Sequence, residues 1–325
     1  MKISVIIPNY NGSLLITRCL DSVFGQNGNH NLDVIVIDDG STDDSIQVIN
    51  NYPGKIKLIR QKNQGPASAR NKGIEIASGN YLAFLDADDY WAPNFLEETV
   101  HFLNENPKAV AVSVGQKHLT LNQQETIIPQ FLNKELADYK KPFLIENFYA
   151  FWAEHNHVCT GSILIRTEIA KKTGGQRIEL RITEDLEFWA LLATYGSFGF
   201  IPSILFISDG VQLTKQIGWF AKNRKRWASA PTVEQWEKRI IKVIQPEFLA
   251  SYQNARGRIA KNLAYSMIMS SRSWLARKTV QNYGANFPKD KVSAIMRYGS
   301  RNFFYWIIVV LIIRLKEYSR ILKLL

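Results

Sequence analysis

Segment 81–89, Tyr-Leu-Ala-Phe-Leu-Asp-Ala-Asp-Asp, carries three carboxylates directly after an uncharged run. The uncharged run is typical of a strand that is buried on both faces. Because buried carboxylates are costly unless they are paired or bind a metal, we expect Asp86, Asp88 and Asp89 at the open carboxyl end of that strand. Such oxygen ligands suit Mg²⁺ or Mn²⁺, which commonly bridge to the phosphates of a substrate. The alternative is a solvated acidic turn that caps a helix after Pro93.

Two further polar segments, 9–12 and 38–42, also follow predicted strands. Strands are expected at 3–8, 33–38, 55–60, 81–85, 109–114, 162–166 and 198–207, and helices at 13–25, 43–52, 67–77 and 185–195. Their alternation in the first part of the chain predicts an α/β fold with a mostly parallel sheet and helices on both faces. Since ligands bind outside the carboxyl ends of such strands, the polar segments should converge on one site.

The composition is that of a folded, intracellular protein. A chain of 325 residues with 46% hydrophobic residues can form a substantial core in one or two domains. The two cysteines, Cys19 and Cys159, lack the spacing of metal ligands and are interpreted as free thiols in a reducing compartment. The N-terminus does not resemble a signal peptide, because polar residues follow Pro8. These features predict a cytoplasmic location.

Charge divides the chain in two. Residues 211–325 contain 22 Lys or Arg and 5 Asp or Glu, a net of +17, whereas residues 1–210 contain 18 and 24, a net of −6. This asymmetry indicates two units with different roles. A basic unit is suited to nucleic acid or to an anionic membrane surface.

Segment 303–313 favours the membrane. Its residues are all uncharged and are aromatic or aliphatic, with Arg301 before them and Arg314 and Lys316 after them. About 20 apolar residues are needed to span a bilayer, so this segment is too short to cross one but suits a peripheral position in the interface. The alternative is a buried C-terminal helix. Nucleic-acid binding fits the uncharged segment and the acidic half of the chain poorly and is not expected.

Five segments resemble the motifs of one known family and occur in its order. They are Ser-Val-Ile-Ile-Pro-Asn-Tyr-Asn at 4–11, Val-Ile-Asp-Asp-Gly-Ser-Thr-Asp at 36–43, Gly-Pro-Ala-Ser-Ala-Arg-Asn-Lys-Gly at 65–73, Phe-Leu-Asp-Ala-Asp-Asp at 84–89 and Thr-Glu-Asp-Leu-Glu-Phe-Trp at 183–189. The chain is similar to inverting family 2 glycosyltransferases with the GT-A fold. The resemblance implies a catalytic domain over 1–210, with a nucleotide-sugar part to about 115 and an acceptor part from about 116. A helical basic region would occupy 211–325.

The resemblance also implies a donor site. The residues expected to bind the nucleotide-sugar are Pro8, Tyr10, Asp38, Asp39, Gly65, Arg70, Asp86, Ala87 and Asp88. A carboxylate such as Asp39 accepts hydrogen bonds from a uracil N–H or a ribose hydroxyl, and Arg70 would pair with Asp39 or approach the diphosphate. Asp88 would bind the divalent metal directly, and Asp86 would reach the ribose, or the metal through water. The alternatives are a turn-forming role for Asp38 or Asp39 and a surface position for Arg70.

Glu184 and Asp185 match the acidic pair of the family at the start of a helix. The resemblance implies that Asp185 is the general base, which takes the proton from an acceptor hydroxyl as its oxygen attacks the anomeric carbon. The N-terminus of a helix favours the ionised carboxylate. The alternative is that both acids only complement the helix dipole.

The expected function is transfer of one sugar from a nucleotide-sugar, with UDP as the usual carrier, to a glycan or lipid-linked acceptor in cell-surface polysaccharide synthesis. Segment 223–227, Asn-Arg-Lys-Arg-Trp, matches the Q-x-x-R-W motif of processive synthases only weakly, so polymerisation is not expected. The alternative is a catalytically silent homologue that binds a glycan or a partner. A dinucleotide-binding dehydrogenase is excluded, because no G-x-G-x-x-G motif follows the first strand.

Overall fold

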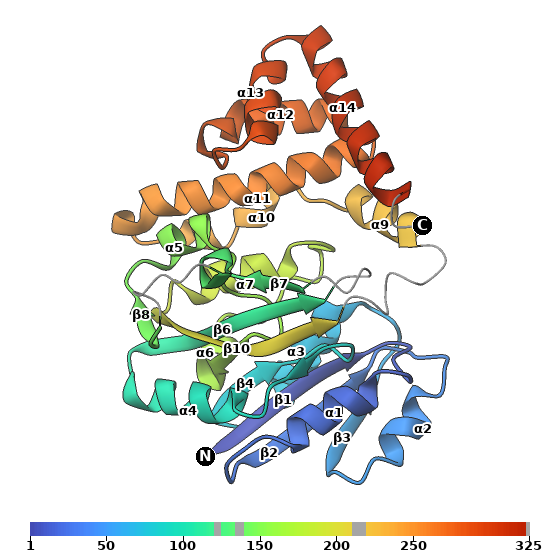
Figure 1. The fold of residues 1–325 in the computed structure, drawn as a ribbon, viewed down its shortest axis with the longest axis vertical. Helices are drawn as coiled ribbons and strands as arrows, with labels where there is room; N and C mark the ends of the chain where they lie inside the picture. Colours follow the sequence, from blue (N-terminus) through green and yellow to red (C-terminus); the bar gives the residue numbers. More distant parts are fainter. Residues whose placement is uncertain (120–124, 134–139, 210–218, 323–325) are drawn as a thin grey trace. The chain divides into compact units, whose positions relative to one another are not determined.

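The computed structural model describes residues 1–119, 125–133, 140–209 and 219–322 (Figure 1). Contacts divide the chain into two compact units: residues 1–148, 155–178 and 184–214 form the first, and residues 149–154, 179–183 and 215–325 form the second. The domain boundary expected near residue 210 lies outside the described residues, so the assignment of a catalytic and a helical domain stays a prediction.

The first unit is built on one mixed sheet (Figure 1). Its strands are β1 Lys2–Asn9, β2 Asn31–Asp38, β3 Ile56–Arg60, β4 Tyr81–Phe84, β5 Tyr90–Trp91, β6 Ala109–Leu119, β7 Glu125–Ile128, β8 Phe143–Ile145, β9 Ile163–Arg166 and β10 Ser197–Asp209. The hydrogen-bonded order is β3-β2-β1-β4-β9-β6-β10-β5, with β7 beside β6 and β8 beside β10. Along this path only β9 and β5 run against their neighbours. The predicted α/β fold with a mostly parallel sheet is therefore confirmed.

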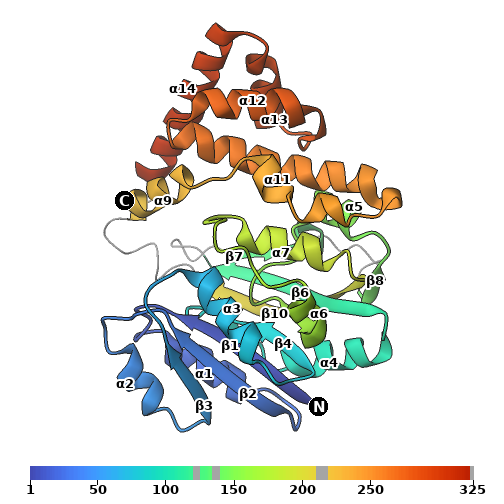
Figure 2. The same ribbon diagram turned by 180° about the vertical axis from the view of Figure 1, so that it is seen from behind.

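Helices cover both faces of the sheet (Figures 1 and 2). They are α1 Ile16–Phe24, α2 Ser45–Asn50, α3 Pro66–Ile76, α4 Phe95–Glu105, α6 Thr167–Lys172 and α7 Glu184–Leu192. Helices α1, α2 and α4 pack on the face that contains Ile3, Val5 and Ile7 of β1. Helix α3 covers the opposite face, where Gly73 lies against Ile6. Burial from both sides explains the continuous apolar runs of these strands.

Several strands, among them β1, β6 and β10, are longer than expected. β1 continues through Pro8 to Asn9, although a proline lacks the N–H of a central strand. The proline is tolerated because β4 ends at Phe84, opposite Ile6, so that only β2 flanks Pro8. β6 extends beyond residue 114 to Leu119 because β10 and β7 pair with its second half.

The second unit is helical. In the described residues its main helices are α9 Trp219–Ala228, α10 Val233–Glu237, α11 Leu249–Met269, α12 Ser273–Tyr283, α13 Lys291–Ser300 and α14 Phe303–Leu322, and α5 Phe148–Glu154 begins at the boundary with the first unit. Short 3₁₀ turns are η1 Gln130–Asn133 in the first unit and η3 Ile240–Lys242, η4 Pro246–Phe248 and η5 Gly284–Asn286 in the second. None of the described helices combines the length and the hydropathy that crossing a bilayer requires.

Candidate active site

The loops after β1 and β2 are joined to each other. Asn9 Nδ2 donates to Asp38 Oδ1 over 3.1 Å and to Ser41 Oγ over 3.2 Å. In return, Thr42 N donates to Asn11 Oδ1 over 2.8 Å. Two of the polar segments that follow predicted strands therefore meet at the carboxyl edge of the sheet.

Both carboxylate oxygens of Asp38 accept hydrogen bonds within this pair of loops. Its side chain has no exposed surface, and its second oxygen accepts from Ser41 N over 3.1 Å. This geometry favours the turn-forming role for Asp38. Of the other donor-site residues in this region, Tyr10 is 52% exposed and available to stack on a planar group, whereas Pro8 is half-buried.

Asp39 organises the next loop. Its Oδ1 accepts from Gln61 Nε2 over 2.7 Å and from Gln64 N over 2.9 Å, and its Oδ2 accepts from Gly65 N over 2.8 Å. Gly65 adopts a φ of 94°, which favours glycine, directly before Pro66 begins α3. A carboxylate offers about four acceptor positions, so Oδ2 keeps one position for a ligand N–H or hydroxyl. Arg70 does not pair with Asp39 by any described hydrogen bond; it points to a different carboxylate.

Arg70 is buried and is bonded to Asp86. It is 5% exposed, and its Nη2 lies 2.7 Å from Asp86 Oδ1. Burial lowers the pKa of the Arg70 guanidinium, but Asp86, followed by Asp185 and Glu184, raises the pKa by more. The surface position considered for Arg70 is therefore wrong. The arginine is a fixed cation that faces acids from two distant segments of the chain.

The carboxylates after β4 form a cluster. Burial, and next the neighbouring Asp86, raise the pKa of Asp88 to about 6. Burial, followed by Asp88 and Asp86, raises the pKa of Asp89 well above its usual range. Helix α4 begins after Asn94 rather than after any of these acids, so the helix-capping interpretation of the cluster is wrong. Ala87 is nearly buried and lies beside Gly12 of the β1 loop.

Arg18 and Asp209 also belong to this cluster, although neither was predicted as a site residue. Arg18 of α1 donates through Nη1 to Asp209 Oδ2 over 2.6 Å and through Nη2 to the main-chain oxygen of Asp88 over 2.7 Å. Its guanidinium also lies 4.6 Å from the centre of the Tyr90 ring. Asp209, at the end of β10, donates its N–H to Asp89 Oδ1 over 3.2 Å. The available signal was that Asp209 also ends a strand of the parallel set.

Asp185 lies in the first turn of α7 together with Glu184. Burial raises the pKa of Asp185, although Arg70 acts in the opposite direction and Asp86 adds a smaller increase. Asp185 Oδ1 accepts from Leu186 N over 2.8 Å. Asp86 and Asp185 thus both lie close enough to Arg70 to influence its pKa.

The acid cluster fits a divalent cation of the Mg²⁺ or Mn²⁺ type. Four carboxyl groups, of Asp86, Asp88, Asp89 and Asp209, lie near only two guanidinium groups, of Arg18 and Arg70, and repulsion from Asp86 adds to the larger effect of burial in raising the pKa of Asp88. Within the described ranges, no three His, Cys, Asp or Glu side chains are grouped to hold a metal alone. Mg²⁺ does not need such a cage, because it is usually held by one or two carboxylates together with substrate phosphates.

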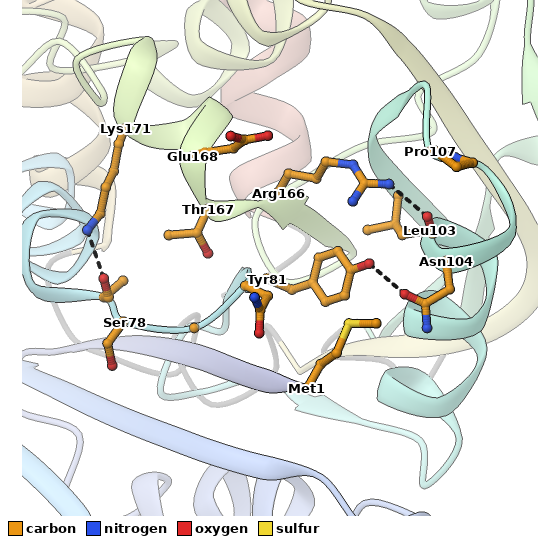
Figure 3. A pocket seen from close by; sticks show the side chains of 13 residues that line it. Met1, Ser78, Tyr81, Leu103, Asn104, Pro107, Arg166, Thr167, Glu168 and Lys171 are labelled. Carbon is orange, nitrogen blue, oxygen red and sulfur yellow. Dashed lines mark hydrogen bonds between the residues drawn. The ribbon is translucent and has the colours of Figure 1, made fainter.

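A hollow of the first unit lies away from these acids. Figure 3 shows this cavity of about 660 Å³, whose lining includes Ser78, Tyr81, Arg166, Thr167 and Lys171. Tyr81 begins β4, whereas the acids follow the end of that strand. The hollow therefore contains none of the predicted site residues and is not the candidate active site.

Comparison with protein families identifies the family of this chain. The model of the family described as Glycosyl transferase family 2 matches residues 4–174, which is more than half of the chain. The chain belongs to glycosyl transferase family 2. The family match includes the β1 and β2 loops, Arg70, Asp86, Asp88 and Asp89, and it ends before Glu184, Asp185 and Asp209. The sequence resemblance to this family is thus confirmed.

Curated relatives of this family 2 chain match about a third of it. An uncharacterized glycosyltransferase of Nostoc sp. is 46% identical over 104 residues, which cover 31% of this chain and 32% of the relative. A poly(ribitol-phosphate) beta-glucosyltransferase of Bacillus spizizenii is 38% identical over 118 residues, covering 34% of this chain and 19% of the relative. The chain therefore spans about a third or less of the length of these relatives.

Solved structures share the family 2 fold. S. aureus TarS, residues 1–349, has a TM-score of 0.64 and 19% identity, covering 98% of this chain and 92% of TarS. A mannosyltransferase of Pyrobaculum calidifontis, solved with GDP-Man and Mn²⁺, has a TM-score of 0.57 and 18% identity, covering 95% of this chain and 86% of that one. TarS has also been solved with UDP-GlcNAc, and this structure has a TM-score of 0.55, 18% identity and coverage of 89% of this chain and 93% of TarS. At this identity the likeness shows the fold.

Proposed function

We propose that the protein is an inverting glycosyltransferase that moves one sugar from a nucleotide-sugar to an acceptor hydroxyl. The observation that carries the proposal is the position of Arg70, which bonds Asp86 at 2.7 Å and faces Asp185 and Glu184 as well. Its guanidinium thus bonds an acid expected at the donor and interacts electrostatically with the acids expected at the acceptor. A homologue without catalytic activity would not require a buried arginine between these two sets of acids.

Donor binding is assigned to the carboxyl edge of the sheet. Tyr10 would stack on the base, and the remaining acceptor position of Asp39 would receive a base N–H or a ribose hydroxyl. Asp38, Asn9 and Gly65 hold the two loops in place. The proposed carrier is UDP, which is supported by the binding of UDP-GlcNAc to TarS.

Asp88, with Asp86 beside it, would hold Mg²⁺ or Mn²⁺ against the diphosphate. When bound, the cation stabilises negative charge on the leaving nucleoside diphosphate as a Lewis acid. Arg70 fixes the orientation of Asp86 through its 2.7 Å bond. The Mn²⁺ in the mannosyltransferase complex supports this assignment.

Asp185 would act as the general base. It would take the proton of the acceptor hydroxyl while the acceptor oxygen attacks the anomeric carbon opposite the leaving group, so the anomeric configuration inverts. Its pKa is raised by burial, which makes it a stronger base than an exposed aspartate. Glu184 adds negative charge at the same helix start and, after Asp86 and Asp185, contributes to the raised pKa of Arg70.

The acceptor is proposed to be a glycan or a lipid-linked saccharide of a cell-surface polymer. The name of the Bacillus spizizenii relative supports a polymer acceptor. The proposed location is the cytoplasmic face of a membrane.

The test is release of UDP from a panel of UDP-sugars without acceptor, with Mn²⁺ or Mg²⁺ and then with EDTA. We expect release from one or two donors, and its loss with EDTA and in Asp88→Asn. Asp44→Asn is the matched control, because Asp44 is an exposed acid that makes no capping hydrogen bond at α2. Absence both of release and of metal-dependent UDP binding by calorimetry would overturn the proposal in favour of the silent homologue.

A further inference from the structure

Helix α14 exposes an apolar stripe along its length. Phe304, Ile308, Leu311 and Leu315 follow helical spacing and are 73%, 53%, 53% and 67% exposed. No charged residue occurs between Asn302 and Arg314. Soluble proteins rarely expose a continuous apolar surface of this kind unless it binds something.

The opposite side of α14 is firmly attached to the helical unit. Trp306 Nε1 donates to the main-chain oxygen of Ser273 over 2.8 Å, and Glu317 accepts from Tyr265 over 2.6 Å. Val309 and Ile313 are buried between these anchors. The exposed stripe is therefore the outer face of a packed helix and does not arise from a detached one.

Helix α13 extends the apolar surface. An apolar hollow of about 370 Å³ is lined by Ala294, Ile295, Tyr298, Tyr305, Ile308 and Val309. The rings of Tyr298 and Tyr305 stack with their centres 5.5 Å apart, and both side chains are about half exposed. Aromatic rings with polar ends, such as these tyrosines, are characteristic of the water–lipid interface.

The charges around this surface are positive. Arg301 and Lys316 are exposed at the two ends of the uncharged segment. Of the five acids in residues 211–325, Glu237 pairs with Arg256 at 3.1 Å, Asp290 pairs with Lys261 at 2.6 Å, and Glu317 is buried, whereas Glu234 and Glu247 are exposed. Few acids are therefore left to balance the basic residues of this unit.

We propose that the outer face of α13 and α14 docks on an anionic membrane surface, with α14 lying in the interface. Its apolar stripe would enter the boundary between headgroups and acyl chains, and Arg301 and Lys316 would meet lipid phosphates. A second copy is the less suitable occupant, because a two-fold interface would bring these cations together without acids to pair them. This inference does not rest on the proposed reaction.

The first test is co-sedimentation of the full chain with vesicles of phosphatidylcholine, with and without phosphatidylglycerol. We expect binding to the mixed vesicles and a loss of at least about tenfold in partition for Phe304→Ser/Leu311→Ser. Ile241→Ser is the matched control, because Ile241 is 45% exposed in η3, outside α13 and α14. Unchanged melting temperatures and unchanged UDP release would show that the double variant remains folded.

The second test separates charge from apolar insertion. Arg301→Gln/Lys316→Gln should weaken binding to the anionic vesicles by about fivefold per charge and reduce its salt dependence. The proposal would be overturned if the wild type and Phe304→Ser/Leu311→Ser bound equally well to vesicles with phosphatidylglycerol and equally well to vesicles without it. A second result would also overturn it: wild-type protein that does not bind vesicles and forms a stable dimer in light scattering, together with a monomeric Phe304→Ser/Leu311→Ser variant.

Discussion

Arg18 and Asp209 form a 2.6 Å ion pair that connects the first helix of the chain to the end of β10, 191 positions away. The same guanidinium holds the main-chain oxygen of Asp88 at 2.7 Å. A single side chain thus links the proposed metal-binding turn to a second carboxylate at the sheet edge. Arg18 is a positioning residue in this arrangement.

Arg18→Lys should therefore weaken donor binding. Lysine keeps the charge but cannot hold two acceptors in the geometry of a guanidinium fork. We expect KM for the nucleotide-sugar to rise and kcat/KM to fall by about tenfold, or about 1.4 kcal/mol, with a smaller change in kcat. Arg60→Lys, at the exposed end of β3, is the control. Equal kinetics in the two variants would show that the bridge has no role in the site.

Asp185→Asn should separate donor binding from transfer. The amide cannot accept the acceptor's proton, so kcat should fall by about 10²–10⁴-fold while metal-dependent UDP binding, measured by calorimetry, stays unchanged.

The control for Asp185 is Glu168→Gln, which removes an exposed acid from the first turn of α6. If the acids at the start of α7 only complement a helix dipole, both variants should lose about 0.3–1 kcal/mol of stability and keep their activity. That outcome would contradict the assignment of the general base.

Gly73→Ala should destabilise the first unit. A Cβ at this position would lie 2.3 Å from Ile6 Cγ2, so α3 would be pushed away from β1. Overpacking of this kind typically costs about 1–3 kcal/mol, and the shift should also reduce activity, because α3 carries Arg70. Urea denaturation would measure the stability. In a double-mutant cycle, Ile6→Ala should remove part of the penalty; strictly additive losses would mean that the clash is absorbed elsewhere.

Acid should weaken the hydrogen bonds by which Asp43, in the loop after β2, holds Ser13 in the loop after β1. Burial would raise the pKa of Asp43, but hydrogen bonds from Ser45 and Ser13 lower it by more, so the net pKa is below the usual value. The stabilisation is therefore complete above the unfolded pKa of about 3.9 and is lost as the pH falls through the lower folded value.

The experiment compares the unfolding free energy of wild type and Asp43→Asn at several pH values. The difference between them should be constant from about pH 7 to about pH 5 and should shrink toward about pH 3. Asp44→Asn, one residue further along, should have a smaller effect, because Asp44 makes no capping hydrogen bond at α2. A difference for Asp43→Asn that persists at the lowest pH would contradict a role for its charge.

Much of the fold and the place of the site followed from the sequence alone. Apolar runs that end in acids, as at Asp38 and Asp86, indicate buried parallel strands, and parallel strands must present their carboxyl ends at one edge. Local patterns determine these features, because strand and helix periodicity depend on neighbouring residues. The predicted strand ends were therefore close to the observed ones, apart from β1, β6 and β10.

The partners of each charge were decided only by the tertiary structure. The sequence could not show that Arg70 is buried against Asp86 or that Arg18 reaches Asp209, because these contacts depend on how helices cross the sheet. The same holds for segment 303–313, where one stripe is buried and the other exposed. A uniformly apolar segment carries no periodic signal, so only packing determines which side chains face the protein.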